Sequence, residues 1–138
     1  MGQVFVNFDV SNFSDVDRAA DGILSRSDVR AISLDEVLMD TGATHLCLPV
    51  DLITRLGLKL GYQTPVETAT GTAVVRVFRA ALVTFEDRSA IVEAVELPAG
   101  RPPLLGAIPM EALGIEPDLR NRRVRRLPQD MTSSYIRI

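Results

Sequence analysis

Cysteine, histidine and lysine each occur only once in this sequence of 138 residues, as Cys47, His45 and Lys59. A lone cysteine cannot form a disulfide within the chain, which favours a reducing, cytoplasmic location. No apolar run is long enough to cross a membrane, and no charged segment followed by an apolar stretch opens the sequence. We therefore expect a protein that is neither secreted nor membrane-bound. The net charge of -3 also disfavours nucleic acid as a partner.

The composition is that of an ordinary globular protein. Hydrophobic residues make up 46% of the chain, and there is no low-complexity tract, internal repeat or linker. Because this length suits one core but not two, we expect a single domain over residues 1–138. Its last part, about residues 128–138, reads as a polar tail.

The hydrophobic pattern predicts many short strands, with a turn about every ten residues, which is typical of a β barrel or sandwich. Polar or glycine-containing turns separate neighbouring strands into hairpins. The predicted strands cover residues 3–10, 29–39, 45–48, 74–85 and 90–97, with a further β segment from residue 58 and a last hairpin around residues 119–122.

Three short helices are expected among the strands, near residues 15–24, 49–56 and 109–113. Ser14 and Asp17 suggest a capping box at the start of the first helix. Each of the other two has a proline at its predicted start and a glycine directly after its predicted end, which are the residues favoured at those positions.

An acid and a glycine follow the strand predicted over residues 29–39. Three apolar residues lead into Asp40-Thr41-Gly42-Ala43. Taken alone, this sequence is compatible with a simple turn in which the carboxylate bonds nearby backbone groups. The apolar lead-in indicates that the carboxylate emerges from buried β structure rather than from an exposed loop.

Two further features follow this motif along the chain. The first is a hairpin with a small, flexible tip at Thr68-Ala69-Thr70-Gly71. The second is Leu104-Leu105-Gly106, which again places a glycine after apolar residues and leads directly into the third predicted helix.

This order resembles the retropepsin (retroviral-type) family of aspartic proteases, in which an Asp-Thr-Gly-Ala turn, a hairpin flap and a hydrophobic-hydrophobic-glycine strand precede a helix. The resemblance covers about residues 29–127. It looks closest to the small, single-domain prokaryotic members, whose glycine element continues in the manner of Gly106-Ala107-Ile108-Pro109. The resemblance implies an all-β fold, a closed acid-protease barrel with short helices.

The resemblance also implies a mechanism and an assembly. Proteases of this type use two aspartates that share one proton, and this chain has one Asp-Thr-Gly. We therefore expect a homodimer whose twofold axis passes between the two Asp40 side chains. A peptide or protein is the implied substrate, with neither a metal nor an organic cofactor.

The resemblance assigns a role to each part of the motif. Asp40 would be catalytic, and Thr41, Gly42 and Ala43 would support the active-site turn. Thr68, Ala69, Thr70 and Gly71 would form the flap that closes over substrate, and Leu104, Leu105 and Gly106 would form the structural glycine element.

Two features depart from the family pattern. Viral enzymes usually carry an arginine directly after the glycine element, where it supports the dimer, and Ala107 stands at that position here. Minimal viral proteases also lack a helix like the one predicted over residues 15–24. Any dimer of this chain must therefore be held by other contacts.

Two other function classes compete with a protease. The first is a dimer of this fold that binds peptides or partner proteins without cleaving them, although an intact Asp-Thr-Gly favours the enzyme. The arginine-rich stretch over residues 120–126 would suit RNA binding. Because Val124 and Leu127 look like inward-facing strand positions, a solvated strand edge is the favoured interpretation.

The single histidine and the single cysteine are expected to be structural. His45 lies close to the motif, but no serine or cysteine has the context of a partner nucleophile. Cys47 stands between two leucines and is expected to behave as a small buried hydrophobic residue.

Overall fold

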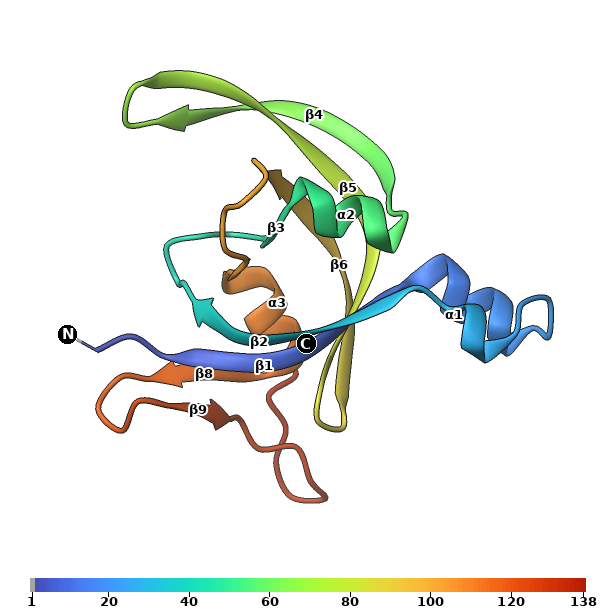
Figure 1. The fold of residues 1–138 in the computed structure, drawn as a ribbon. Coiled ribbons are helices and arrows are strands. Elements are labelled where there is room, and N and C mark those ends of the chain that lie inside the picture. Colours follow the sequence, from blue (N-terminus) through green and yellow to red (C-terminus); the bar gives the residue numbers. More distant parts are fainter. Residues whose placement is uncertain (1) are drawn as a thin grey trace.

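The computed structural model describes residues 2–138, and about half of them lie in strands (Figure 1). The strands are β1 Phe5–Asn12, β2 Ala31–Met39, β3 Leu46–Pro49, β4 Lys59–Thr68, β5 Gly71–Phe85, β6 Arg88–Leu97, β7 Leu104–Leu105, β8 Ile115–Asp118 and β9 Arg123–Arg126. The helices are α1 Phe13–Ala20, α2 Val50–Leu56 and α3 Ala107–Leu113, with one short 3-10 turn, η1, at Arg26–Asp28.

Seven strands form one mixed sheet in the order β1-β2-β7-β3-β6-β5-β4. Because β1 also pairs with β5, six of these strands close into a ring, and β4 extends from that ring as one arm of a long hairpin with β5 (Figure 1). The predicted all-β acid-protease class is confirmed. The closure is a ring of six strands rather than a regular barrel, since β7 contributes only two residues.

The core lies inside this ring, where the inward faces of the strands meet α3. In β1, buried and exposed residues alternate with the period of two that a half-buried strand requires, so Val6, Phe8 and Val10 point inward. Leu113 of α3 is fully buried among them. The ring therefore holds together through apolar contacts from nearly every element.

The predicted strands and hairpins are confirmed, with ends that shift by a few residues. The first strand begins and ends two residues later than expected, because Asn12 still pairs with Ala81 of β5. The turn at Ala69-Thr70, inside the predicted flap tip, and the turn at Glu86-Asp87 both connect antiparallel neighbours.

The first helix differs from its prediction over residues 15–24. It covers residues 13–20, because the Asn12 side chain, not Ser14, accepts the hydrogen bond from the Asp15 N–H that caps the helix. Gly22, with a φ of 74°, then lies in the turn that ends it. The predicted capping box was wrong because an asparagine two residues earlier provides the cap.

The predicted C-terminal ends of the other two helices are confirmed. Gly57 and Gly114 adopt left-handed φ values of 63° and 66° and terminate α2 and α3. The third helix begins at Ala107 rather than Pro109. The proline lies in the first turn, where its missing N–H leaves no bond unmade.

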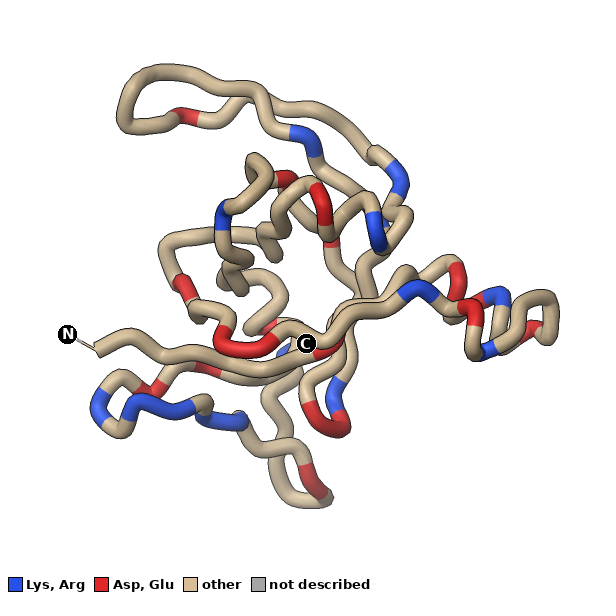
Figure 2. Tube along the Cα trace, viewed as in Figure 1, with Lys and Arg blue, Asp and Glu red and all other residues tan. Residues whose placement is uncertain are grey.

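The arginine-rich stretch covers the turn after β8 and the strand β9, seen as a basic segment in Figure 2. Its three arginines in β9 all form ion pairs with carboxylates. Arg125 Nε lies 2.7 Å from Glu116 on the paired strand β8, and Arg126 Nη2 lies 2.6 Å from Asp87. Val124 packs against the core, as predicted. Within residues 2–138, no helix combines the length and apolar character needed to span a bilayer.

Arg88 connects the C-terminal segment, residues 113–135, to the sheet. Its side chain is buried, and its guanidinium donates to the carbonyls of Leu113 and Gly114, at 3.2 and 2.7 Å, and to that of Leu127 at 2.6 Å. The ring of Tyr135 stacks on the same guanidinium, with 4.8 Å from Cζ to the ring centroid.

Replacing Arg88 with methionine should destabilise the fold. The variant keeps an apolar stem but leaves buried carbonyl groups without donors, so we expect a loss of about 2–4 kcal/mol in the free energy of unfolding. Arg120→Met is the matched control, because Arg120 is exposed and its loss should change stability by less than about 0.5 kcal/mol. Denaturant unfolding measures both; equal stabilities would contradict the role given to Arg88.

Candidate active site

Asp40 directly follows β2 and is held by backbone bonds to two other segments. Its N–H donates to the carbonyl of Leu105 at 2.9 Å, and the preceding N–H, that of Met39, donates to the carbonyl of Val4 at 2.9 Å. The Asp40 side chain is half-buried, whereas Met39 beside it is in the core. The carboxylate therefore stands at the end of a fixed strand and faces out of the core.

The turn after Asp40 is tight. Oδ1 of Asp40 accepts a 2.9 Å bond from the N–H of Gly42, and the N–H of Ala43 donates to the Asp40 carbonyl at 3.1 Å. A Cβ on Gly42 would lie 3.2 Å from that same Oδ1, so a larger residue would press on the carboxylate. Turns of this kind also occur in proteins that are not enzymes. The turn here differs from a simple surface turn in the hydrogen bonds that attach it to other segments.

The glycine element lies directly against this turn. The two-residue strand β7 runs between β2 and β3, so that Leu105 is the register partner of both Met39 and Leu46. The N–H of Gly106 then donates to the carbonyl of His45 at 3.0 Å. A Cβ on Gly106 would lie 2.4 Å from that oxygen and 2.7 Å from the carbonyl of Ala43, which explains why this position is glycine.

The start of α3 is also hydrogen-bonded to the Asp40 turn. The first N–H groups of a helix have no partner inside the helix. Here the N–H groups of Ala107 and Ile108 donate to the carbonyls of Ala43 and Thr44, at 2.8 and 2.9 Å. The helix and the turn therefore satisfy each other's backbone groups, and the predicted residues 40–43 and 104–106 lie together.

The predicted flap is the end of the β4–β5 hairpin, which leaves the ring and curves over it (Figure 1). Thr68, Ala69, Thr70 and Gly71 are exposed, and Thr68 Oγ1 donates to the Gly71 carbonyl at 2.7 Å across the tip. No hydrogen bond found within residues 2–138 joins this tip to the Asp40 turn. The structure thus keeps the flap residues separate from the rest of the site.

The sequence model of one protein family, described as aspartyl protease, matches residues 33–108. The chain belongs to the aspartyl protease family. The matched region begins in β2 and ends in the first turn of α3, so it contains the Asp40 turn, the flap hairpin and Gly106. It supports the resemblance to the retropepsin family. A search of curated proteins finds no match for the chain.

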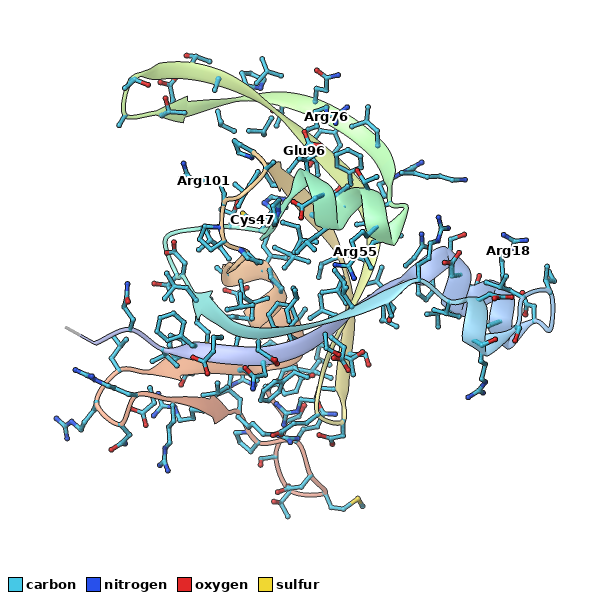
Figure 3. The ribbon with its side chains drawn as sticks, viewed as in Figure 1. Arg18, Cys47, Arg55, Arg76, Glu96 and Arg101 are labelled. Atoms are coloured by element: carbon cyan, nitrogen blue, oxygen red, sulfur yellow. The ribbon has the colours of Figure 1, made fainter. Side chains whose placement is uncertain are left out.

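The base of the predicted flap is fixed by an ion pair. Figure 3 shows Arg76 of β5 and Glu96 of β6 lying together where the hairpin leaves the ring. The guanidinium donates to both carboxylate oxygens, at 3.0 and 2.7 Å, and its Cζ lies 5.2 Å from the ring centroid of Phe78. Motion of the flap is therefore expected in the part of the hairpin beyond Arg76.

A chain of polar contacts also joins the hairpin to the segment that follows the Asp40 turn. Tyr62 of β4 donates to Oε1 of Glu93 at 3.1 Å, and the same oxygen lies 3.5 Å from Nε2 of His45. The other ring nitrogen of His45 lies 2.7 Å from Oγ1 of Thr44. Sequence reasoning missed Tyr62 and Glu93, because nothing in their local sequence shows that separate strands bring them to His45.

Cys47 behaves as a buried apolar residue. Burial, with a smaller contribution from the negative charge of Asp40, raises the pKa of its thiol to about 11. The thiol points at the backbone carbonyl of His45, 3.7 Å away, and not at the imidazole. Because the thiol stays protonated at neutral pH, the pair does not form a cysteine–histidine nucleophile. Within residues 2–138, no three side chains of histidine, cysteine, aspartate or glutamate gather in a way that would hold a metal ion.

Replacing Gly106 with alanine should destabilise the site and the fold. The new Cβ would collide with backbone oxygens of β3 and of the turn, and such overpacking costs about 1–3 kcal/mol. Gly2→Ala is the control, since a Cβ there would meet only the side chain of Arg122, which can move. Thermal unfolding of both variants checks this, and an unchanged melting temperature for Gly106→Ala would contradict the packing described here.

Proposed function

We propose that this chain is an aspartic endopeptidase that works as a homodimer, in which Asp40 of each copy supplies one half of the catalytic pair. The chain would act as a single protease domain that carries half of an active site. Its substrate would be a peptide or an unfolded protein segment in extended form.

The observation that carries the proposal is the geometry around Asp40. The N–H groups of Met39 and Asp40 are bonded to Val4 and Leu105 in other segments, while the Asp40 carboxylate is left half-exposed at the end of β2. A structural aspartate would more usually have a cationic partner, as Asp15 has in Arg30. The family match over residues 33–108 supports the same assignment.

Two carboxylates are needed because the reaction moves two protons. One carboxylate, ionised, takes a proton from water as the water oxygen attacks the peptide carbonyl carbon. The other, protonated, donates to the carbonyl oxygen and stabilises the charge that develops there. A proton then passes to the amide nitrogen as the C–N bond breaks. The sequence contains one Asp-Thr-Gly, so the second carboxylate would come from another copy.

The other motif residues would serve this pair indirectly. Thr41 and Gly42 are exposed beside the carboxylate, where Thr41 would bond across the dimer axis and Gly42 would let a substrate backbone approach. The flap tip at Thr68–Gly71 would close over the peptide and add strand-like backbone bonds. Ala107 provides no charged side chain for the dimer, so a weak, exchanging dimer is expected.

Asp40→Asn should abolish peptide cleavage without unfolding the protein. The amide has nearly the same shape but cannot accept the proton from water. A diverse peptide library, analysed by mass spectrometry from acidic to neutral pH, measures the cleavage. Activity should fall as the pH rises through neutrality, because one carboxylate of the pair must keep its proton.

Three outcomes of this experiment discriminate between mechanisms. Cleavage by Asp40→Asn, or loss of wild-type cleavage on addition of a chelator, would refute the proposed chemistry. Peptides that bind to the wild-type protein and are released intact would instead support a peptide-binding module. Asp35→Asn makes the same change at an exposed aspartate of β2 outside the proposed pair, and it should retain cleavage.

Mixing wild-type and Asp40→Asn chains tests whether the site is shared. If each site needs two Asp40 residues, a mixed dimer is inactive. Random pairing of equal amounts leaves about one quarter of the dimers fully wild-type. Activity per total protein should therefore fall to about a quarter of the value for wild-type protein alone. Labelled chains would confirm that exchange took place. A fall to only one half, with exchange shown, would mean that each chain carries a complete site.

A further inference from the structure

A basic pocket of about 310 Å³ lies between α1, the end of α2 and the base of the flap hairpin. It is at the opposite end of the molecule from the turn that connects β2 to β3 (Figure 1). Four cations line it: Arg18 from α1, Arg30 from the segment before β2, Lys59 from β4 and Arg79 from β5. Segments far apart in the sequence therefore bring positive charge to one hollow.

The pocket has one carboxylate, and that group already has a partner. Arg30 donates to both oxygens of Asp15, with Nε at 2.8 Å and Nη2 at 3.0 Å, and its backbone N–H adds a third bond at 3.0 Å. These bonds hold the pKa of Asp15 below its ordinary value, so it carries a single negative charge at neutral pH. Four cations against one carboxylate leave three positive charges in excess, in a chain whose net charge is -3.

The remaining cations have no acidic partner. Within residues 2–138, no carboxylate lies within the 4.0 Å ion-pair distance of Arg18, Lys59 or Arg79. Lys59 and Arg79 are direct partners across the antiparallel pair of β4 and β5. Like charges placed opposite each other on a sheet destabilise it. A bound anion would relieve this repulsion.

The side chain of Arg79 also has a fixed course over the sheet. A Cβ on Gly61 would lie 2.8 Å from Cγ of Arg79 and 3.2 Å from its Cδ, so the arginine stem lies across the glycine. The hydroxyl-bearing Ser14, in the first turn of α1, lines the same pocket and adds a neutral donor.

We propose that this pocket binds the phosphate group of a small phosphorylated compound. A phosphate monoester carries a charge of about -1.5 to -2 and three acceptor oxygens, which suits an excess of cations better than a carboxylate does. Guanidinium groups match the geometry of phosphate oxygens through paired N–H donors. A volume of about 310 Å³ is at the lower end for small-molecule pockets and favours a compact ligand over a macromolecule.

The proposal is independent of the protease function. Ligand bound here would connect α1 to the base of the β4–β5 hairpin, and none of the pocket residues used above belongs to the proposed catalytic turn or the flap tip. Binding can therefore be measured without any assay of cleavage.

Titration calorimetry with pyrophosphate and with adenosine monophosphate tests the proposal. Wild-type protein should bind at least one of them saturably, with one site per chain, and should melt at a higher temperature in its presence. Lys59→Gln/Arg79→Gln should bind at least about tenfold more weakly, since two charge-assisted contacts are lost. Arg101→Gln/Arg120→Gln removes the same charge from exposed arginines outside the pocket and should bind as the wild type does.

A second variant covers the case in which the double substitution fails to fold. Arg18→Gln changes one exposed residue of α1 and should also weaken binding. No saturable binding of either probe to the wild type would overturn the proposal. Equal weakening in the Arg101→Gln/Arg120→Gln control would do the same, since it would indicate a general charge effect. Binding only to phospholipid vesicles or phosphopeptides, with neither small probe bound, would likewise reject a small-ligand site.

Discussion

The backbone lock between the Asp40 turn and the segment Leu104–Ile108 is the constraint on which the rest of this structure depends. Four hydrogen bonds make it: Asp40 to Leu105, Gly106 to His45, Ala107 to Ala43 and Ile108 to Thr44. They join the end of one strand, a two-residue strand and the start of a helix into a single unit. Because all four involve backbone groups, the position of the Asp40 backbone depends little on neighbouring side chains.

This lock also explains how a half-exposed carboxylate can be held in one place. A side chain on a free loop would sample many positions, whereas here the residues on either side of Asp40 are fixed by bonds to Val4, Leu105 and, through the turn, α3. A reaction that needs two carboxylates in close contact requires this kind of preorganisation. The flap is built differently, since its tip is exposed and its firm attachment is further down the hairpin at Arg76.

Charged side chains are distributed unevenly over the molecule, which the net charge of the chain does not show. The arginines of β9 face carboxylates on β8 and on the β5–β6 turn, and Arg88 is used inside the fold to hold the C-terminal segment. At the other end of the molecule, Lys59 and Arg79 lie opposite each other without an acidic neighbour in ion-pair range among the described residues. Arginines that look alike in the sequence therefore have three different environments: surface ion pairs, a buried site among carbonyl groups, and a basic pocket.

The strand-rich class, the hairpins and the main motif could be predicted from the sequence, because period-two alternation, turn residues and Asp-Thr-Gly are local signals. The sequence did not determine where α1 begins, since Asn12 competes with Ser14 for the cap and its amide is fixed by the carbonyl of Leu56 across the fold. The contact of Tyr62, Glu93 and His45 and the basic pocket likewise became visible only in the folded chain. Both require residues that are distant in sequence to be neighbours in space, and strand register and ring closure, not local pattern, set those distances.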